Sequence, residues 1–82
     1  MIGIEIQSRL TRHSVIERAI MYFGPNGLDL EIDQQSGTHA HFSRGRGYVA
    51  IELESEPITR RTCVSISGKE FEPQIRKFIE KL

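Results

Sequence analysis

Residues 28–54 read LDLEIDQQSGTHAHFSRGRGYVAIELE, and apolar and polar side chains alternate along most of this stretch. An alternation with a period of two is typical of a strand that buries one face and exposes the other. The alternation is interrupted at residues 34–37 and 44–47, where glycine and polar residues favour turns. The stretch therefore predicts three antiparallel strands joined by short turns, at residues 28–33, 38–43 and 48–54.

The same alternation occurs outside this stretch and predicts two further strands, at residues 2–7 and 61–67. In every strand the apolar positions fall on one face, which we expect to point inward. These inward positions are Ile2, Ile4, Ile6, Leu28, Leu30, Ile32, Ala40, Phe42, Val49, Ile51, Leu53, Val64 and Ile66. A sheet with one apolar face needs a second layer to cover that face.

Helical periodicity between the first two strands predicts one element of this second layer. Apolar residues recur on one helical face from position 15 to position 23. Ser14 and Glu17 have the spacing of a capping box, and Thr11 is an alternative cap for the same helix. Gly24, followed directly by proline, predicts the end of the helix.

A second apolar stripe of helical spacing runs from Phe71 to Leu82 and predicts a helix that reaches the C-terminus. Pro73 suits the first turn of this helix, where its missing N–H is not needed. The element order is then β-α-β-β-β-β-α. Because each helix has a single apolar stripe, we expect an α+β fold of two layers, with both helices on one face of an antiparallel sheet. Residues 1–82 are short enough to form a single domain.

By element order alone, this arrangement resembles a reduced helix-grip fold or the repeat of the TATA-binding protein. A ferredoxin-like order would require a helix after the third strand, and none is predicted there. The resemblance implies an architecture and no activity, because no family motif accompanies it. A helix-grip sheet can hold a small apolar ligand, but both apolar stripes here are used in covering the sheet, so no large cavity is expected.

Charge, hydropathy and cysteine content argue against several classes of protein. Eleven Lys and Arg balance eleven Asp and Glu, so the chain lacks the basic excess typical of nucleic-acid-binding proteins. The longest apolar run is too short to span a membrane, and residues 1–10 do not have the pattern of a signal peptide. The single cysteine, Cys63, cannot form an intramolecular disulfide, which favours a reducing compartment and predicts a cytoplasmic protein.

The outward face of the predicted sheet is polar and acidic, and it carries two histidines. From the predicted turn lengths, one cross-strand row consists of Asp33, His39, Glu52 and Cys63. Histidine and carboxylate groups are zinc ligands, which makes His39, His41 and Glu52 candidate ligands of zinc or another divalent metal. The alternative explanation is ordinary charge pairing between neighbouring strands.

The same face is the basis of an enzyme hypothesis. A small metal-dependent or acid–base enzyme would use His39, His41, Glu31 and Glu52, with His41 opposite Glu31 in the predicted register. A cysteine nucleophile is disfavoured, because Glu52 next to Cys63 would oppose formation of the thiolate.

The turn at residues 44–47 places Arg44 and Arg46 next to glycines, which superficially resembles an RGG-type RNA-binding element or an anion-binding loop. Lys69 is expected nearby. Glycine in this position is equally typical of a hairpin turn, and a phosphate-binding loop normally leads into a helix rather than a strand. Weak binding of RNA or of an anion by Arg44, Arg46 and Lys69 is therefore an alternative function, although nucleic acid is a disfavoured partner.

The leading hypothesis is a small non-catalytic module that binds a ligand or a protein. No nucleophile, base and electrophile are predicted within reach of one another, and no cofactor is expected unless the zinc hypothesis holds. A chain of 82 residues buries a thin core, and association is a common remedy. We therefore expect a homo-oligomer, with a homodimer as the simplest form, or a complex with a protein partner.

Overall fold

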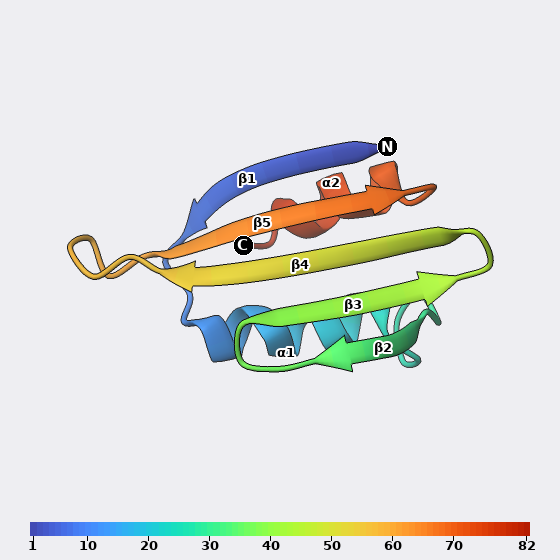
Figure 1. Ribbon diagram of the computed structural model, residues 1–82, viewed down its shortest axis with the longest axis horizontal. Helices are drawn as coiled ribbons and strands as arrows, with labels where there is room; N and C mark the ends of the chain where they lie inside the picture. Colours follow the sequence, from blue (N-terminus) through green and yellow to red (C-terminus); the bar gives the residue numbers. More distant parts are fainter.

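The alternating segments form five strands in the computed structural model, which describes residues 1–82 (Figure 1). The strands are β1 (Ile2–Ser8), β2 (Glu31–Gln35), β3 (His39–Arg44), β4 (Gly47–Ser55) and β5 (Thr62–Lys69). The helices are α1 (Arg12–Phe23) and α2 (Glu72–Ile79). The α+β class and the order β-α-β-β-β-β-α, predicted from the sequence, are confirmed.

The strands form one sheet in the order β1-β5-β4-β3-β2, and every neighbouring pair is antiparallel. The four consecutive strands β2 to β5 make a meander, as expected from the short connections between them. The sequence did not indicate the position of β1, which pairs with β5 along its whole length, from Ile2 opposite Gly68 to Ser8 opposite Thr62. The two edges of the sheet are therefore β1 and β2.

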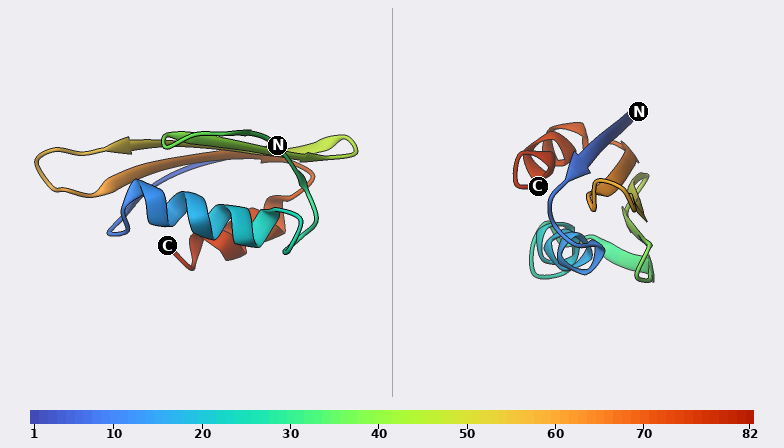
Figure 2. Two further views of the ribbon diagram at one scale, coloured as in Figure 1. Left: turned by 90° about the horizontal axis from the view of Figure 1, so that it is seen from below. Right: turned by 90° about the vertical axis from the view of Figure 1, so that its left-hand side faces the viewer.

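Both helices cover the same face of the sheet, as Figure 2 shows in its edge-on view. Helix α1 packs mainly on β3 and β4, and α2 packs mainly on β5. The core is one cluster of 15 buried apolar residues, with further residues packed against it. All the inward positions predicted from the strand alternation belong to this cluster or contact it. Neither helix is long and apolar enough to cross a membrane.

Helix α1 is capped by Thr11, the alternative that the sequence offered. The Thr11 hydroxyl accepts a hydrogen bond of 3.1 Å from the backbone N–H of Ser14. The predicted capping box that began at Ser14 is wrong, because Ser14 lies inside the first helical turn. Glu17 instead forms an exposed ion pair with His13, at 2.9 Å. The helix ends at Gly24, as predicted.

Helix α2 ends at Ile79, so the prediction that it continues to Leu82 is wrong. The backbone N–H of Leu82 donates to the carbonyl of Ile79 at 3.1 Å. This bond spans three residues, as in a turn, instead of the four residues of an α-helix. The hydroxyl of Ser8 donates to the carbonyl of Leu82 at 3.2 Å. The last residues leave the helix, and this contact links them to the end of β1.

Candidate functional site on the open sheet face

No element covers the face of the sheet opposite the helices (Figure 2). The outward side chains of this open face are polar, and several are acidic. The exposed carboxylates on it are Glu5, Glu31, Asp33, Glu52 and Glu54. Lys69 is the basic residue at an outward strand position, opposite Tyr48. The open face is therefore acidic although the chain has no net charge.

A groove of about 330 Å³ crosses the open face. It exists because short side chains stand next to one another on adjacent strands: Gly3, Ser67 and Ala50 form one cross-strand row. In the next row Ser65 lies between Glu5 and Glu52. The residues that line the groove are Gly3, Ile4, Glu5, Ala50, Glu52, Ser65, Ile66 and Ser67. Its floor is formed by small residues, and two carboxylates flank it.

The groove is absent from the predictions made from the sequence. Part of the signal was available, because Ala50, Ser65 and Ser67 are short side chains at outward positions of two neighbouring strands. Gly3 completes the row only because β1 pairs with β5. That pairing joins the two ends of the chain, and alternation within a single strand does not reveal it.

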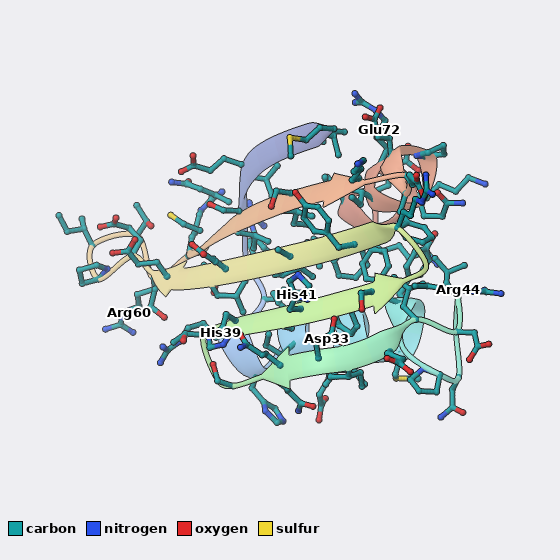
Figure 3. The ribbon with its side chains drawn as sticks, turned by 45° about the vertical axis from the view of Figure 1, so that its right-hand side comes forward. Asp33, His39, His41, Arg44, Arg60 and Glu72 are labelled. Atoms are coloured by element: carbon teal, nitrogen blue, oxygen red, sulfur yellow. The ribbon has the colours of Figure 1, made fainter.

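His41 lies in the same cross-strand row as Ala50 and forms a hydrogen bond with Asp33. The Nδ1 atom of His41 is 2.9 Å from Oδ2 of Asp33, and Figure 3 shows the two side chains close together on β3 and β2. The ring of His41 stacks on Tyr48, with 5.7 Å between the ring centroids and 10° between the planes. With Nδ1–H directed at the carboxylate, Nε2 is the ring nitrogen left free.

The predicted positions of two carboxylates on β2 are wrong. A β-bulge at Asp33 places this residue beside His41 rather than opposite His39. Glu31 faces Ser43 instead of His41, a shift of two positions. Strand β2 continues through Gln34 and Gln35, so its connection to β3 has three residues, 36–38, instead of the predicted five. The extra residue of the bulge then moves the pairing back by one position.

The predicted neighbour of Cys63 is also wrong. The loop between β4 and β5 has six residues, 56–61, instead of the predicted five. Arg60 adopts a left-handed conformation, with φ of 59°, that helps to close this longer loop. Cys63 therefore lies opposite Glu54 and not opposite Glu52. The row that was to combine a histidine, two carboxylates and the thiol does not form.

The candidate metal ligands come together only in part. His39 lies directly opposite Glu52, as predicted, and His41 lies two residues further along β3. The Nδ1 atom of His39 is 2.9 Å from the hydroxyl oxygen of Ser36, and that of His41 is taken by Asp33. No group of three His, Cys, Asp or Glu side chains is arranged to hold a metal ion. The geometry thus gives the zinc hypothesis no third ligand.

The candidate anion ligands lie at one end of the sheet. Strands β3 and β4 are joined by a two-residue turn that contains Arg46, shorter than the predicted loop of four residues. Arg44 lines a hollow together with Asp29 and Glu31. Lys69 is at the same end, on β5. Because carboxylates border the hollow beside Arg44, this end of the sheet is of mixed charge.

Hydrogen bonding by Ser43, and then by His41, lowers the pKa of Asp33 below its usual value. A carboxyl group whose pKa is lower in the folded state stabilises the fold at pH values above its unfolded pKa, near 4. This stabilisation is lost as the pH falls through the lower, folded pKa.

We expect Asp33→Asn to lower the free energy of unfolding at neutral pH. The difference from the wild-type protein should shrink as the pH falls below about 4, because both chains are then uncharged at this position. Urea denaturation at a series of pH values measures this difference. Glu31→Gln is the matched control, since Glu31 is an exposed carboxylate of the same strand without an ion pair. The same pH dependence in both variants would contradict the expectation.

Comparison with known proteins identifies a fold relative and no family. No protein-family model matches the chain, and no curated protein matches its sequence. The crystal structure of the protein SSP2350 from Staphylococcus saprophyticus matches with a TM-score of 0.61 and 17% sequence identity. The match covers 96% of this chain and 78% of that chain. At this identity the likeness shows a shared fold alone.

Proposed function

We propose that this protein is a small non-catalytic binding module whose open sheet face binds a cationic partner, such as a lysine-rich or arginine-rich protein segment. The observation that carries the proposal is the groove between Glu5 and Glu52 on the face that no helix covers. Short side chains in its floor leave room for a bound segment, and the flanking carboxylates favour a positive charge there.

The distribution of charge over the whole chain supports the same partner. The carboxylates of the open face are exposed, whereas most arginines and lysines lie on the helices and in the connections. The helices carry an excess of basic residues, Arg12, Arg18, Arg76 and Lys77, over the acidic residues Glu17 and Glu72. A molecule with opposite charges on its two faces attracts a cationic partner towards the acidic face and raises its rate of association.

Acid–base catalysis is the second candidate function, and the hydrogen bond between His41 and Asp33 favours it. A carboxylate that accepts from Nδ1–H fixes the tautomer of the ring and leaves Nε2 as a base. We rank it second because Nε2 of His41 makes no hydrogen bond to a nucleophile in the structure.

The cellular setting and the oligomeric state also belong to the proposal. Cys63 is a free thiol, which suits a reducing compartment, and we place the protein in the cytoplasm. We further propose that the chain associates with itself, because its core is formed by only 15 buried apolar residues.

Titration of ¹⁵N-labelled protein with a short lysine-rich peptide tests the binding proposal. We expect amide signals of β1, β4 and β5 to shift, and the shifts to weaken as salt is added, because exposed charges are screened. A glutamate-rich peptide of the same length should cause no such shifts. Lysine-peptide shifts that are absent, or that fall equally on the helices, would contradict the proposal.

Two variants locate the binding site. Ala50→Arg places a long cationic side chain in the groove and should abolish binding of the lysine-rich peptide. Glu52→Gln should weaken it roughly two- to fivefold, the effect of a solvent-exposed charge pair. Glu80→Gln removes an exposed carboxylate at the end of α2 and is the matched control. Equal losses in Glu52→Gln and Glu80→Gln would place the binding outside the groove.

A further inference from the structure

The two edges of the sheet differ in their protection against pairing with another strand. Strand β2 has five residues and is interrupted by the bulge at Asp33. All its side chains except that of Ile32 are exposed. Strand β1 has seven residues in continuous register with β5. Short length, bulges, proline and charged side chains are the usual protections of an edge strand, and of these β1 has only the carboxylate of Glu5.

Strand β1 also carries apolar side chains that the chain covers incompletely. Ile4 and Ile6 point to the helical side of the sheet but are only partly buried. The reason is that α2 packs mainly on β5 and α1 on β3 and β4, so the layer of helices thins towards this edge. A further strand beside β1 would cover the remaining apolar surface.

Both ends of β1 are attached to α2 or to the residues that follow it, which holds the strand in place. The N-terminal ammonium group of Met1 is 2.9 Å from Oε1 of Glu72, at the start of α2. At the other end Ser8 donates to the carbonyl of Leu82. The free edge between these two contacts is therefore an ordered template for a pairing strand.

We propose that β1 pairs antiparallel with β1 of a second copy of this chain and joins two five-stranded sheets into one continuous sheet. A pair of identical strands related by a two-fold axis is self-complementary. Two residues that face each other across the pair must project on the same face of the sheet. Because side chains alternate between the faces along β1, both residues have even numbers or both have odd numbers, and the two numbers add to an even sum.

Charge and length select one register among the even sums. With a sum of ten, Glu5 would lie opposite Glu5, since 5 + 5 = 10, and like charges that face each other are destabilising. With a sum of eight, 2 + 6 places Ile2 opposite Ile6, 4 + 4 places Ile4 opposite itself, and 3 + 5 places Gly3 opposite Glu5. A sum of six would pair only residues 2–4, and a sum of twelve would place Ile4 opposite Ser8 and leave Ile2 unpaired. The sum of eight pairs the isoleucines and separates the carboxylates.

The helices leave room for this arrangement. The two copies of β5 would be three strand spacings apart, roughly 14 Å at about 4.8 Å for each spacing. Two α2 helices centred on these strands fit side by side, because a helix with its side chains is about 10 Å wide. Their neighbouring apolar side chains would lie over the paired isoleucines.

The dimer deepens the self-association proposed above, and its consequence for the open face rests in addition on the proposed binding of a cationic partner. Gly3 and Glu5 line the groove. In the selected register Gly3 faces Glu5 of the second copy, and Glu5 faces Gly3 of the second copy. The grooves of the two chains therefore meet at the two-fold axis. A cationic segment long enough to cross the axis would contact both copies at once.

Light scattering after size exclusion, over a series of protein concentrations, tests the dimer. We expect a mass that rises towards twice that of one chain. Disulfide cross-linking tests the register, with Cys63→Ser as the background so that no other thiol is present. Gly3→Cys and Glu5→Cys are both suitable, because Glu5 is exposed and a Cβ on Gly3 would meet nothing within 4 Å.

In the selected register, a mixture of the Gly3→Cys and Glu5→Cys proteins should form a disulfide-linked heterodimer under mild oxidation, and neither protein should cross-link alone. Cross-linking of Glu5→Cys alone would indicate the sum of ten, and cross-linking of Gly3→Cys alone the sum of six; either would overturn the register. Gln35→Cys on the protected edge strand β2 is the matched control and should form no disulfide-linked dimer, although its unchanged β1 still associates.

The inference fails if the wild-type chain keeps the mass of one copy at every concentration and the mixture does not cross-link faster than Gln35→Cys. In that case, shifts caused by the lysine-rich peptide in the monomer would still support the proposed binding of a cationic partner. A dimer that shows no shifts with the peptide would support the edge pairing and contradict that binding.

Discussion

Replacing Phe23 with alanine should lower the free energy of unfolding by about 3–5 kcal/mol, the usual cost of removing a buried aromatic side chain. Phe23 is completely buried at the end of α1. Its ring centroid lies 5.0 Å from those of Tyr22 and Phe78, and 5.6 Å from that of Phe42. This ring thus joins α1, α2 and β3, and its removal leaves a cavity where the three elements meet.

The loss is large relative to the free energy of unfolding of the whole domain, because native domains are stable by only about 5–15 kcal/mol. Urea denaturation of the two proteins in the same buffer measures it. Ile58→Ala is the control, because Ile58 is 89% exposed in the loop between β4 and β5. That substitution should change the free energy of unfolding by less than about 0.5 kcal/mol. Similar losses in the two variants would show that the aromatic cluster does not hold the layers together.

The burial of individual side chains could be predicted from the sequence, and the reason is local. Val49, Ile51 and Leu53 are buried because alternate residues of any strand point to the same face. Phe23 is buried because it follows the apolar stripe of α1 at helical spacing. These assignments depend on a single element, so neighbouring strands do not have to be known.

The register between neighbouring strands could be predicted for β3 and β4 but not for the other pairs. The connection between β3 and β4 is tight, and the expected pairing of His39 with Glu52 is confirmed. At Asp33 the alternation is lost because Gln34 and Gln35 are also polar and exposed, and nothing in such a run marks a bulge. At Arg60 a residue other than glycine takes up a left-handed conformation, which the sequence does not indicate.

The same distinction applies to the candidate site. The residues that point to the open face could be predicted from the alternation of side chains within each strand. Which of them touch depended on the bulge in β2, on the lengths of the β2–β3 and β4–β5 connections, and on the pairing of β1 with β5. The hydrogen bond between His41 and Asp33 and the groove beside Gly3 both arise from these longer-range features.

Gly27, in the connection that follows α1, is a position where one added methyl group should be severely disruptive. A Cβ atom there would overlap the backbone carbonyl oxygens of Met21 and Tyr22, in the last turn of the helix. The turn cannot move aside freely, because the N–H of Leu28 donates to the carbonyl of Tyr22 at 2.9 Å and that of Gly27 donates to Gly24 at 2.9 Å.

Relief of the overlap in Gly27→Ala must therefore come from a shift of the helix end itself, and forced shifts of this kind cost about 1–3 kcal/mol or more. We expect the upper part of this range, because the overlapped atoms belong to the backbone and because the same helical turn positions the ring of Phe23. Urea denaturation measures the loss. Hydrogen exchange should also show weaker protection of the amide of Leu28, whose hydrogen bond to the helix is strained.

Gly37→Ala separates this steric effect from the general effect of replacing a glycine. Gly37 lies between β2 and β3, and a Cβ there would meet nothing within 4 Å. Alanine should be neutral at this position, or stabilising by about 0.4–1 kcal/mol, because it restricts the unfolded chain. If Gly27→Ala is as stable as Gly37→Ala, the connection after α1 adapts at little cost, and the close packing of the turn against the helix end is not a requirement of the fold.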